Sequence, residues 1–200
     1  METWRVGTFE TNSSSSHVLT IGKKLRPIEE FPVPDADGVI NVEFVRTDWG
    51  CLDFAPSPTT FNEFLVLAIG MMADGGDPRM YSPNEKDQVR FIKWLNIVYK
   101  MVGLPEVKAV RMSWSTTLEI RQSGHGGISD HWAETTSSFQ NNGLDGFLNS
   151  LAYAITPDTS MGWMDKVLES IPEEDYKADV YLYNAALAVV GNSTGSIEGN

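Results

Sequence analysis

Cysteine is almost absent from this chain. The single Cys51 excludes an internal disulfide and fits a reducing compartment. The first residues lack the basic region and apolar run of a signal peptide. The longest apolar run, Phe64 to Met72 with Gly70 inside it, is far shorter than the roughly 20 residues of a membrane span. We therefore expect a soluble, intracellular protein without membrane association.

Basic residues are also scarce. The 200 residues include 15 Lys and Arg against 27 Asp and Glu, a formal net charge of -12. Such a charge repels a phosphate backbone, so we expect no direct binding of nucleic acid. An acidic surface suits a protein partner with a basic surface, or it serves solubility alone. Both readings stay open at this point.

Complete catalytic and cofactor motifs are missing as well. The sequence contains no Walker-type loop, no dinucleotide-binding glycine fingerprint and no Gly-x-Ser-x-Gly nucleophile elbow. Its three histidines do not show the His-x-x-x-His spacing of a helical metal site. We predict no cofactor and no metal. Whether the protein is an enzyme is left open.

Runs of β-branched and aromatic residues predict strands in several places. Between the second and third of them lies an irregular connector with Pro27, Pro32 and Pro34. The predicted strands cover Trp4 to Phe9, Val18 to Ile21, Val39 to Val45, a hairpin of Val107 to Ser113 with Thr117 to Arg121, and a strand-turn-strand unit over Val180 to Val190.

Helical spacing of apolar residues and capping signals predict four helices. Thr60 and Glu63 form a capping box for the first, which stops near Asp74-Gly75-Gly76, and Gly103 ends the second. For the second helix we expect Ser82 as N-cap, Pro83 at the first position, Glu85 closing the box, and a buried face of Val89, Ile92, Leu95, Val98 and Val102. The third covers about Leu144 to Ala154 and the fourth about Met161 to Ile171, where Pro172 and the acidic residues 173–175 end it.

These elements predict a single α+β domain over residues 1–200. We expect a mainly antiparallel sheet with about four helices packed against it, because amphipathic helices must cover an apolar surface. Residues 192–200, rich in Gly, Asn and Ser, are expected to form a flexible polar tail.

The first candidate site is the polar loop between the first two predicted strands. Backbone amides and hydroxyls of consecutive serines suit an anion, and His17 is able to act as acid, base or phosphate ligand. The candidate ligand-binding residues are Asn12, Ser13, Ser14, Ser15, Ser16 and, near the other end of the chain, Asn192. The structural alternative is a hairpin loop whose serines cap backbone groups.

A second polar segment contains Asp130 and His131. If the protein is an enzyme, His17, Asp130 and His131 are the candidate catalytic residues, as general acid and base. Trp49 and Trp132 are candidate partner-binding residues, because loop aromatics often anchor partners, although they more often cover the core. Trp163, with Met164 and Val167, fits either a dimer patch or a core stripe.

The segment Glu10-Thr11-Asn12-Ser13-Ser14-Ser15-Ser16-His17 resembles the N-terminal signature of uncharacterised proteins of tailed bacteriophages. Asp48-Trp49-Gly50, Ser129-Asp130-His131 and Val189-Val190-Gly191-Asn192 are weaker echoes of the same family. Ser193 and Trp132 depart from its pattern. The resemblance implies a phage origin and residence in the host cytoplasm.

Our leading functional hypothesis is a phage accessory protein that binds and modulates a host protein, with a role against host defence or in host takeover. The acidic charge and the loop aromatics motivate it. The first alternative is an enzyme or ligand sponge that binds a nucleotide or phosphorylated small molecule in a Ser, His and Asp pocket. The second is a structural component of the virion. The oligomeric state is left open.

Overall fold

A computed structural model describes residues 17–20, 22, 24–43, 60–72, 84–113, 117–124, 127–129, 143–155, 162–192 and 194–197. The first half contains β1 (His17–Thr20), the 3-10 helix η1 (Ile28–Glu30), β2 (Val39–Glu43), α1 (Phe61–Met72) and α2 (Glu85–Val102). The second half contains β3 (Ala109–Ser113), β4 (Thr117–Arg121), β5 (Gly127–Ser129), α3 (Gly143–Ala154), α4 (Gly162–Glu169), α5 (Glu173–Ala178), α6 (Val180–Val190) and β6 (Thr194–Ile197). The fold is therefore mixed α+β.

The strands in the described part of the chain form two separate sheets. A four-stranded sheet has the order β2-β3-β4-β5, in which β2 is parallel to β3 and the other neighbours are antiparallel. A two-stranded antiparallel ribbon joins β1 and β6. The expected mainly antiparallel sheet is thus a small mixed sheet, because the long connection through α1 and α2 brings β3 back parallel to β2.

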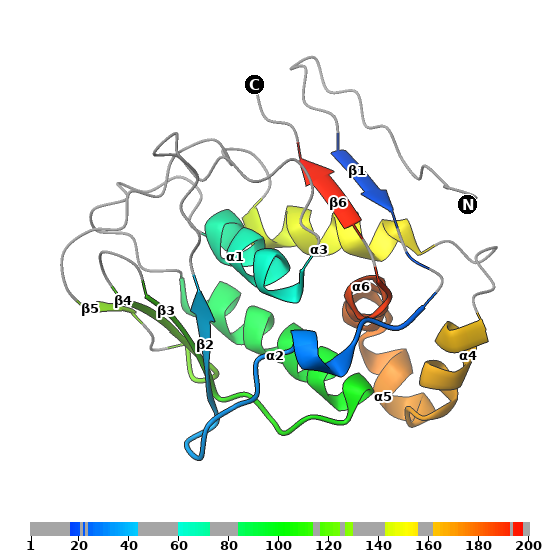
Figure 1. Cartoon of the computed structure of the whole chain (residues 1–200), viewed down its shortest axis with the longest axis horizontal. Helices are drawn as coiled ribbons and strands as arrows, with labels where there is room; N and C mark the ends of the chain where they lie inside the picture. The colour runs from blue at the N-terminus through cyan, green and yellow to red at the C-terminus, as the bar shows by residue number, and fades with distance from the viewer. Residues whose placement is uncertain are drawn as a thin grey trace.

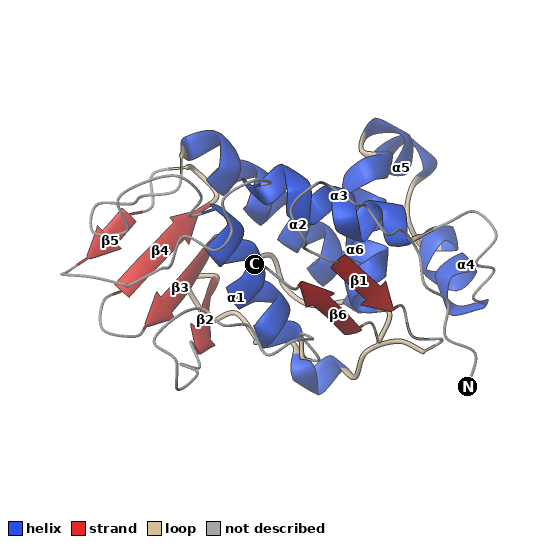
Figure 2. Ribbon diagram, turned by 90° about the horizontal axis from the view of Figure 1, so that it is seen from above, coloured by secondary structure: helices blue, strands red, loops and turns tan. Residues whose placement is uncertain are grey.

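Helices make up the centre of the molecule (Figure 1). The four-stranded sheet lies at one end of this helical core, and α4 and α5 lie at the opposite end (Figures 1 and 2). One cluster of buried apolar side chains extends from Ile40 in β2 to Val190 in α6. The described residues form six α-helices rather than about four. They pack largely on one another instead of only on a sheet.

The prediction of a strand-turn-strand unit over Val180 to Val190 was wrong, because this segment is the helix α6. It packs against α3 and α2. Its residues 185–190 are all buried. A helix that is enclosed on every side is apolar all round, so its pattern matches that of a buried strand. The small Ala185, Ala186 and Ala188 give its neighbours room to approach.

Two further predictions near the C-terminus were wrong. Glu173, Glu174 and Asp175 do not end a helix but form the first turn of α5. Carboxylates are favourable at a helix N-terminus, where the helix dipole is positive. Part of the expected loop-like tail is the strand β6, in which Thr194 pairs with Thr20.

The first two predicted helices are confirmed with one shifted boundary. In α1, the Glu63 amide donates to Thr60 Oγ1 and the Thr60 amide donates to Glu63 Oε2, which is the predicted capping box. The cap of α2 is Asn84 rather than Ser82, since Asn84 Oδ1 accepts from the Asp87 amide at 2.9 Å. Gly103 ends α2 as predicted, in the left-handed region at φ 75°.

The buried face of α2 is rotated relative to the prediction. Ile92, Leu95 and Val98 are buried as expected, but Val89 is exposed and Gln88 is buried. Gln88 Oε1 accepts a hydrogen bond from the Arg121 amide in β4, so the polar side chain is paired where it faces the sheet. The third helix and the β3–β4 hairpin lie where they were predicted.

Candidate binding surface

Residues 24–38, which we call the connector, link the β1–β6 ribbon to β2. The connector crosses the front of the helical core in Figure 1, from the side of α4 to β2. Arg26 and Phe31 are its buried anchors, at 3% and 2% exposure. The two residues flank the short 3-10 helix η1, in a stretch where three prolines limit regular structure. Beyond its first residues, where Leu25 forms an isolated bridge with Gly191, the connector is held mainly by side chains.

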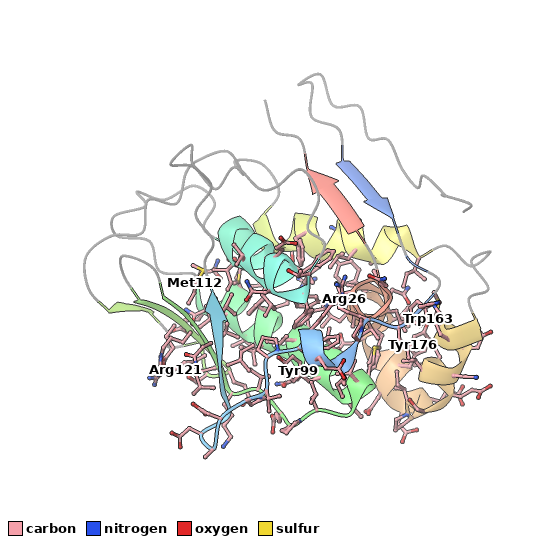
Figure 3. All side chains as sticks on the ribbon, in the orientation of Figure 1. Arg26, Tyr99, Met112, Arg121, Trp163 and Tyr176 are labelled. Atoms are coloured by element: carbon pink, nitrogen blue, oxygen red, sulfur yellow. The ribbon has the colours of Figure 1, made fainter. Side chains whose placement is uncertain are left out.

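Arg26 fastens the first part of the connector to α6. Its amide donates to the Val190 carbonyl at 2.8 Å, and its Nε donates to the Val189 carbonyl at 3.1 Å. Its Nη1 pairs with Glu30 Oε2 at 2.6 Å, and its guanidinium lies over the Phe64 ring of α1, 5.4 Å from the centroid. Arg26 thus lies against both α6 and α1 (Figure 3). A buried charge is tolerated here because it is paired and hydrogen-bonded.

Aromatic packing fastens the middle of the connector. Phe31 lies 4.4 Å from the Phe61 ring and 6.3 Å from the Tyr99 ring, measured between centroids. The Tyr99 hydroxyl donates to the Pro32 carbonyl at 2.6 Å. Burial raises the pKa of Tyr99 above its ordinary value, which keeps this hydroxyl protonated as a donor.

A turn fastens the last part of the connector. Asp35 Oδ1 accepts from the amides of Asp37 and Val39, both at 2.9 Å, and the Gly38 amide donates to the Asp35 carbonyl at 3.0 Å. Gly38 has a φ of 81°, which favours glycine. Asp35 therefore stabilises the turn that joins the connector to β2.

Apolar side chains project to solvent from this anchored segment. Leu25, Ile28 and Val33 are exposed by 48%, 48% and 69%. Exposed carboxylates stand beside them, at Glu29, Asp35 and Asp37. Within residues 27–37 there is no basic residue. We call the three apolar side chains the apolar strip. The strip and its carboxylates together form an apolar and acidic surface.

A groove of about 510 Å³ adjoins the start of the apolar strip. It lies between the connector, the end of α2 and one face of α4, and it is lined by Leu25, Met101, Gly162, Trp163, Lys166, Val167 and Ser170. Of the three side chains considered for a dimer patch, Met164 and Val167 are mostly buried, as in a core stripe. Trp163 is half-buried and borders the groove. Figure 3 shows Trp163 on the α4 side of the molecule.

A compact charge cluster lies on the four-stranded sheet, at the other end of the molecule. Glu119 in β4 pairs with Arg111 at 2.9 Å and with Arg121. Burial opposes ionisation of this carboxylate, but hydrogen bonds from the two guanidinium groups lower the pKa of Glu119 below its ordinary value overall. The cluster joins β3 to β4 through one carboxylate shared by two guanidinium groups, so we assign it to the sheet.

Of the predicted site residues, the structure describes His17 and Asn192. Asn12, Ser13, Ser14, Ser15, Ser16, Trp49, Asp130, His131 and Trp132 lie outside the described residues. His17 begins β1 opposite Ile197 in β6. Asn192 is exposed and its amide donates to the Lys24 carbonyl at 2.8 Å. β1 and β6 are antiparallel, with Thr20 opposite Thr194 and His17 opposite Ile197. Asn192 comes just before β6, so it lies at the Thr20 end of the ribbon and His17 lies at the other end.

The described residues contain no group of three or more His, Cys, Asp and Glu side chains arranged to hold a metal ion. Among the helices of this part of the chain, none has the length and apolarity needed to cross a membrane. Comparisons with protein-family models, with curated proteins and with solved structures found no match to this chain.

Proposed function

We propose that this protein is an accessory protein that binds a partner protein carrying a basic surface. The observation that carries the proposal is the apolar strip, whose three exposed side chains stand among carboxylates on a firmly anchored connector. Exposed apolar side chains rimmed by polar groups are typical of protein interfaces. Because the connector is already ordered, binding requires little loss of conformational freedom.

Charge defines the kind of partner. The net charge of -12 attracts a basic protein over long range, and Glu29, Asp35 and Asp37 supply local carboxylates next to the strip. The phage-like N-terminal signature supports a host protein as that partner, with interference in a host process as the outcome.

The test is a capture experiment at low and at high salt. Its three baits are the wild-type protein, a triple variant of the apolar strip and a control variant. We expect the wild-type protein to retain a specific polypeptide at low salt, and the Leu25→Ser, Ile28→Ser, Val33→Ser triple variant to lose it. The matched control is Val89→Ser, because Val89 is also an exposed valine, at 43%, but lies on α2. Equal retention by the triple variant would remove the apolar strip from the interface.

The folded state of each bait is checked by thermal unfolding. Substitutions at exposed positions usually change the free energy of unfolding by no more than about 0.5 kcal/mol, so all three baits should melt at similar temperatures. A retained polypeptide that resists high salt would contradict the electrostatic part of the proposal, because attraction between exposed charges is screened by salt.

A further inference from the structure

The strand β2 forms one edge of the four-stranded sheet. Among the strands that the structure describes, it pairs with β3 alone. The Ala109 amide of β3 donates to the Gly38 carbonyl at 3.3 Å, just before β2 begins. Backbone groups in a strand point alternately to its two sides. The Gly38 carbonyl and the amides and carbonyls of Ile40 and Val42 therefore point toward β3, whereas Val39 and Asn41 direct theirs to the open edge.

The open edge is capped at its first position. The Val39 amide donates to Asp35 Oδ1 at 2.9 Å, and the Val39 carbonyl accepts from the Asp35 amide at 3.0 Å. Two residues later, the amide and carbonyl of Asn41 make no hydrogen bond toward this edge with any residue that the structure describes. Asn41 is also exposed. The turn at Asp35 thus protects the start of the edge and leaves Asn41 as its first free position.

Two carboxylates precede this free position in the chain. Asp35 and Asp37 lie just before β2 and are exposed, and β2 itself contains no basic residue. The nearby cations are Lys108, whose side chain lies beside Gly38, and Arg111, which pairs with Asn41 in the register and forms an ion pair with Glu119. The segment that leads into the free position is therefore acidic.

We propose that β2 accepts an extended basic segment of the partner protein as an added strand, paired at Asn41. This inference rests on the proposed function and names the form in which the partner binds. The connector leads directly into β2, so the apolar strip and the strand edge are successive parts of one chain segment (Figure 1). Strand addition gives affinity through main-chain hydrogen bonds and specificity through alternate side chains.

A second copy of this chain fits the edge less well. Two copies of this chain carry the same net charge of -12 and therefore repel each other. The exposed carboxylates of Asp35 and Asp37 attract lysine side chains on an incoming strand, so charge complementarity favours a basic segment over self-association.

The test uses a short synthetic peptide of alternating Lys and Val, titrated into the whole isotope-labelled protein and followed by the other backbone amide resonances of β2 and β3 in NMR, which every variant retains. We expect binding by the wild type and by Asn41→Ala, which keeps the backbone amide. Asn41→Pro removes that amide, and proline is tolerated on a strand edge, so binding should weaken roughly tenfold. A peptide in which Glu replaces Lys should not bind.

A second arm leaves the protein unchanged, in case Asn41→Pro fails to fold. In a peptide added as a strand, every second residue directs its amide toward β2. N-methylation of that alternate set should abolish binding, whereas N-methylation of the other set should not. Equal binding of the Lys and Glu peptides, or of both methylated peptides, would overturn the inference. A dimer of the wild type that Asn41→Pro dissociates would also overturn it, by assigning the edge to a second copy.

The two proposals fail in different ways. If the triple variant of the apolar strip loses the captured protein while neither Asn41→Pro nor methylation affects the peptide, the inference about the edge is wrong and the proposed function stands. If Asn41→Pro blocks the peptide while the triple variant still captures the same protein, the edge binds strands but the apolar strip is not the interface.

Discussion

Replacing Arg26 by alanine tests whether the connector is a fixed platform. Truncation leaves the Val189 carbonyl without its side-chain donor, removes the pair with Glu30 and empties the space over the Phe64 ring. Breaking a buried pair by removing one partner costs roughly 3–5 kcal/mol. The Glu30 side chain keeps 31% exposure and so regains water, which favours the lower end, about 3 kcal/mol.

The chain offers a matched control for this substitution. Arg90 makes the same two interactions, a pair with Asp145 at 2.7 Å and a position 5.4 Å from the centroid of the Tyr181 ring. Its side chain is 31% exposed and that of its partner is 57% exposed, whereas the Arg26 side chain is fully buried. Arg90→Ala should therefore cost less than about 1 kcal/mol, as exposed ion pairs do.

Urea and thermal unfolding measure both variants. A loss of about 3 kcal/mol corresponds to a fall in Tm of roughly 6–12 °C for a protein of this size. Amide hydrogen exchange should also accelerate at Phe31, because Arg26 holds the connector on which Phe31 lies. Equal losses below about 1 kcal/mol for Arg26→Ala and Arg90→Ala would refute the reasoning, since burial would then not decide the energy of the pair.

Three further predictions follow from other contacts. Tyr99→Phe should lower the free energy of unfolding by about 1–2 kcal/mol in urea, because the Pro32 carbonyl loses its donor; no change would show that water replaces the hydroxyl. Glu119 has a lowered pKa in the folded state, so its stabilising effect is present above its ordinary pKa and is lost as the pH falls through the folded value. Glu119→Gln should flatten the acid limb of a stability-against-pH curve, and an unchanged limb would contradict this. Gly22→Ala should separate β1 from β6, since an added Cβ would meet the Asn192 carbonyl oxygen, and unaltered exchange of the β6 amides would argue against it.

Helix boundaries were predictable where local chemistry decides them. The capping box of Thr60 and Glu63 is present as read from the spacing. Gly103 takes the left-handed conformation expected at a helix end. The cap of α2 was placed two residues too early, because Ser82 and Asn84 are both good cap residues and the sequence does not rank them.

Elements whose identity depends on their neighbours were not predictable in this way. Residues 180–190 form a helix because α2 and α3 enclose it, and an enclosed apolar run lacks a polar face that would reveal its period. The acidic residues predicted to end a helix instead form the first turn of α5. In this position Asp175 pairs with Lys100 of α2 at 2.8 Å, a contact between segments far apart in the sequence.

The sequence by itself determined the charge of this protein, its mixed α+β class and most of its helices, since these depend on composition and on contacts within a few residues. It did not distinguish Phe31, which is buried, from Val33, which is exposed by 69%, although both are apolar and two residues apart. An irregular connector has no period from which burial can be read. Only the tertiary structure decided which side chains of the connector face the core and which face solvent, because Arg26 and Tyr99 hold its backbone in one orientation.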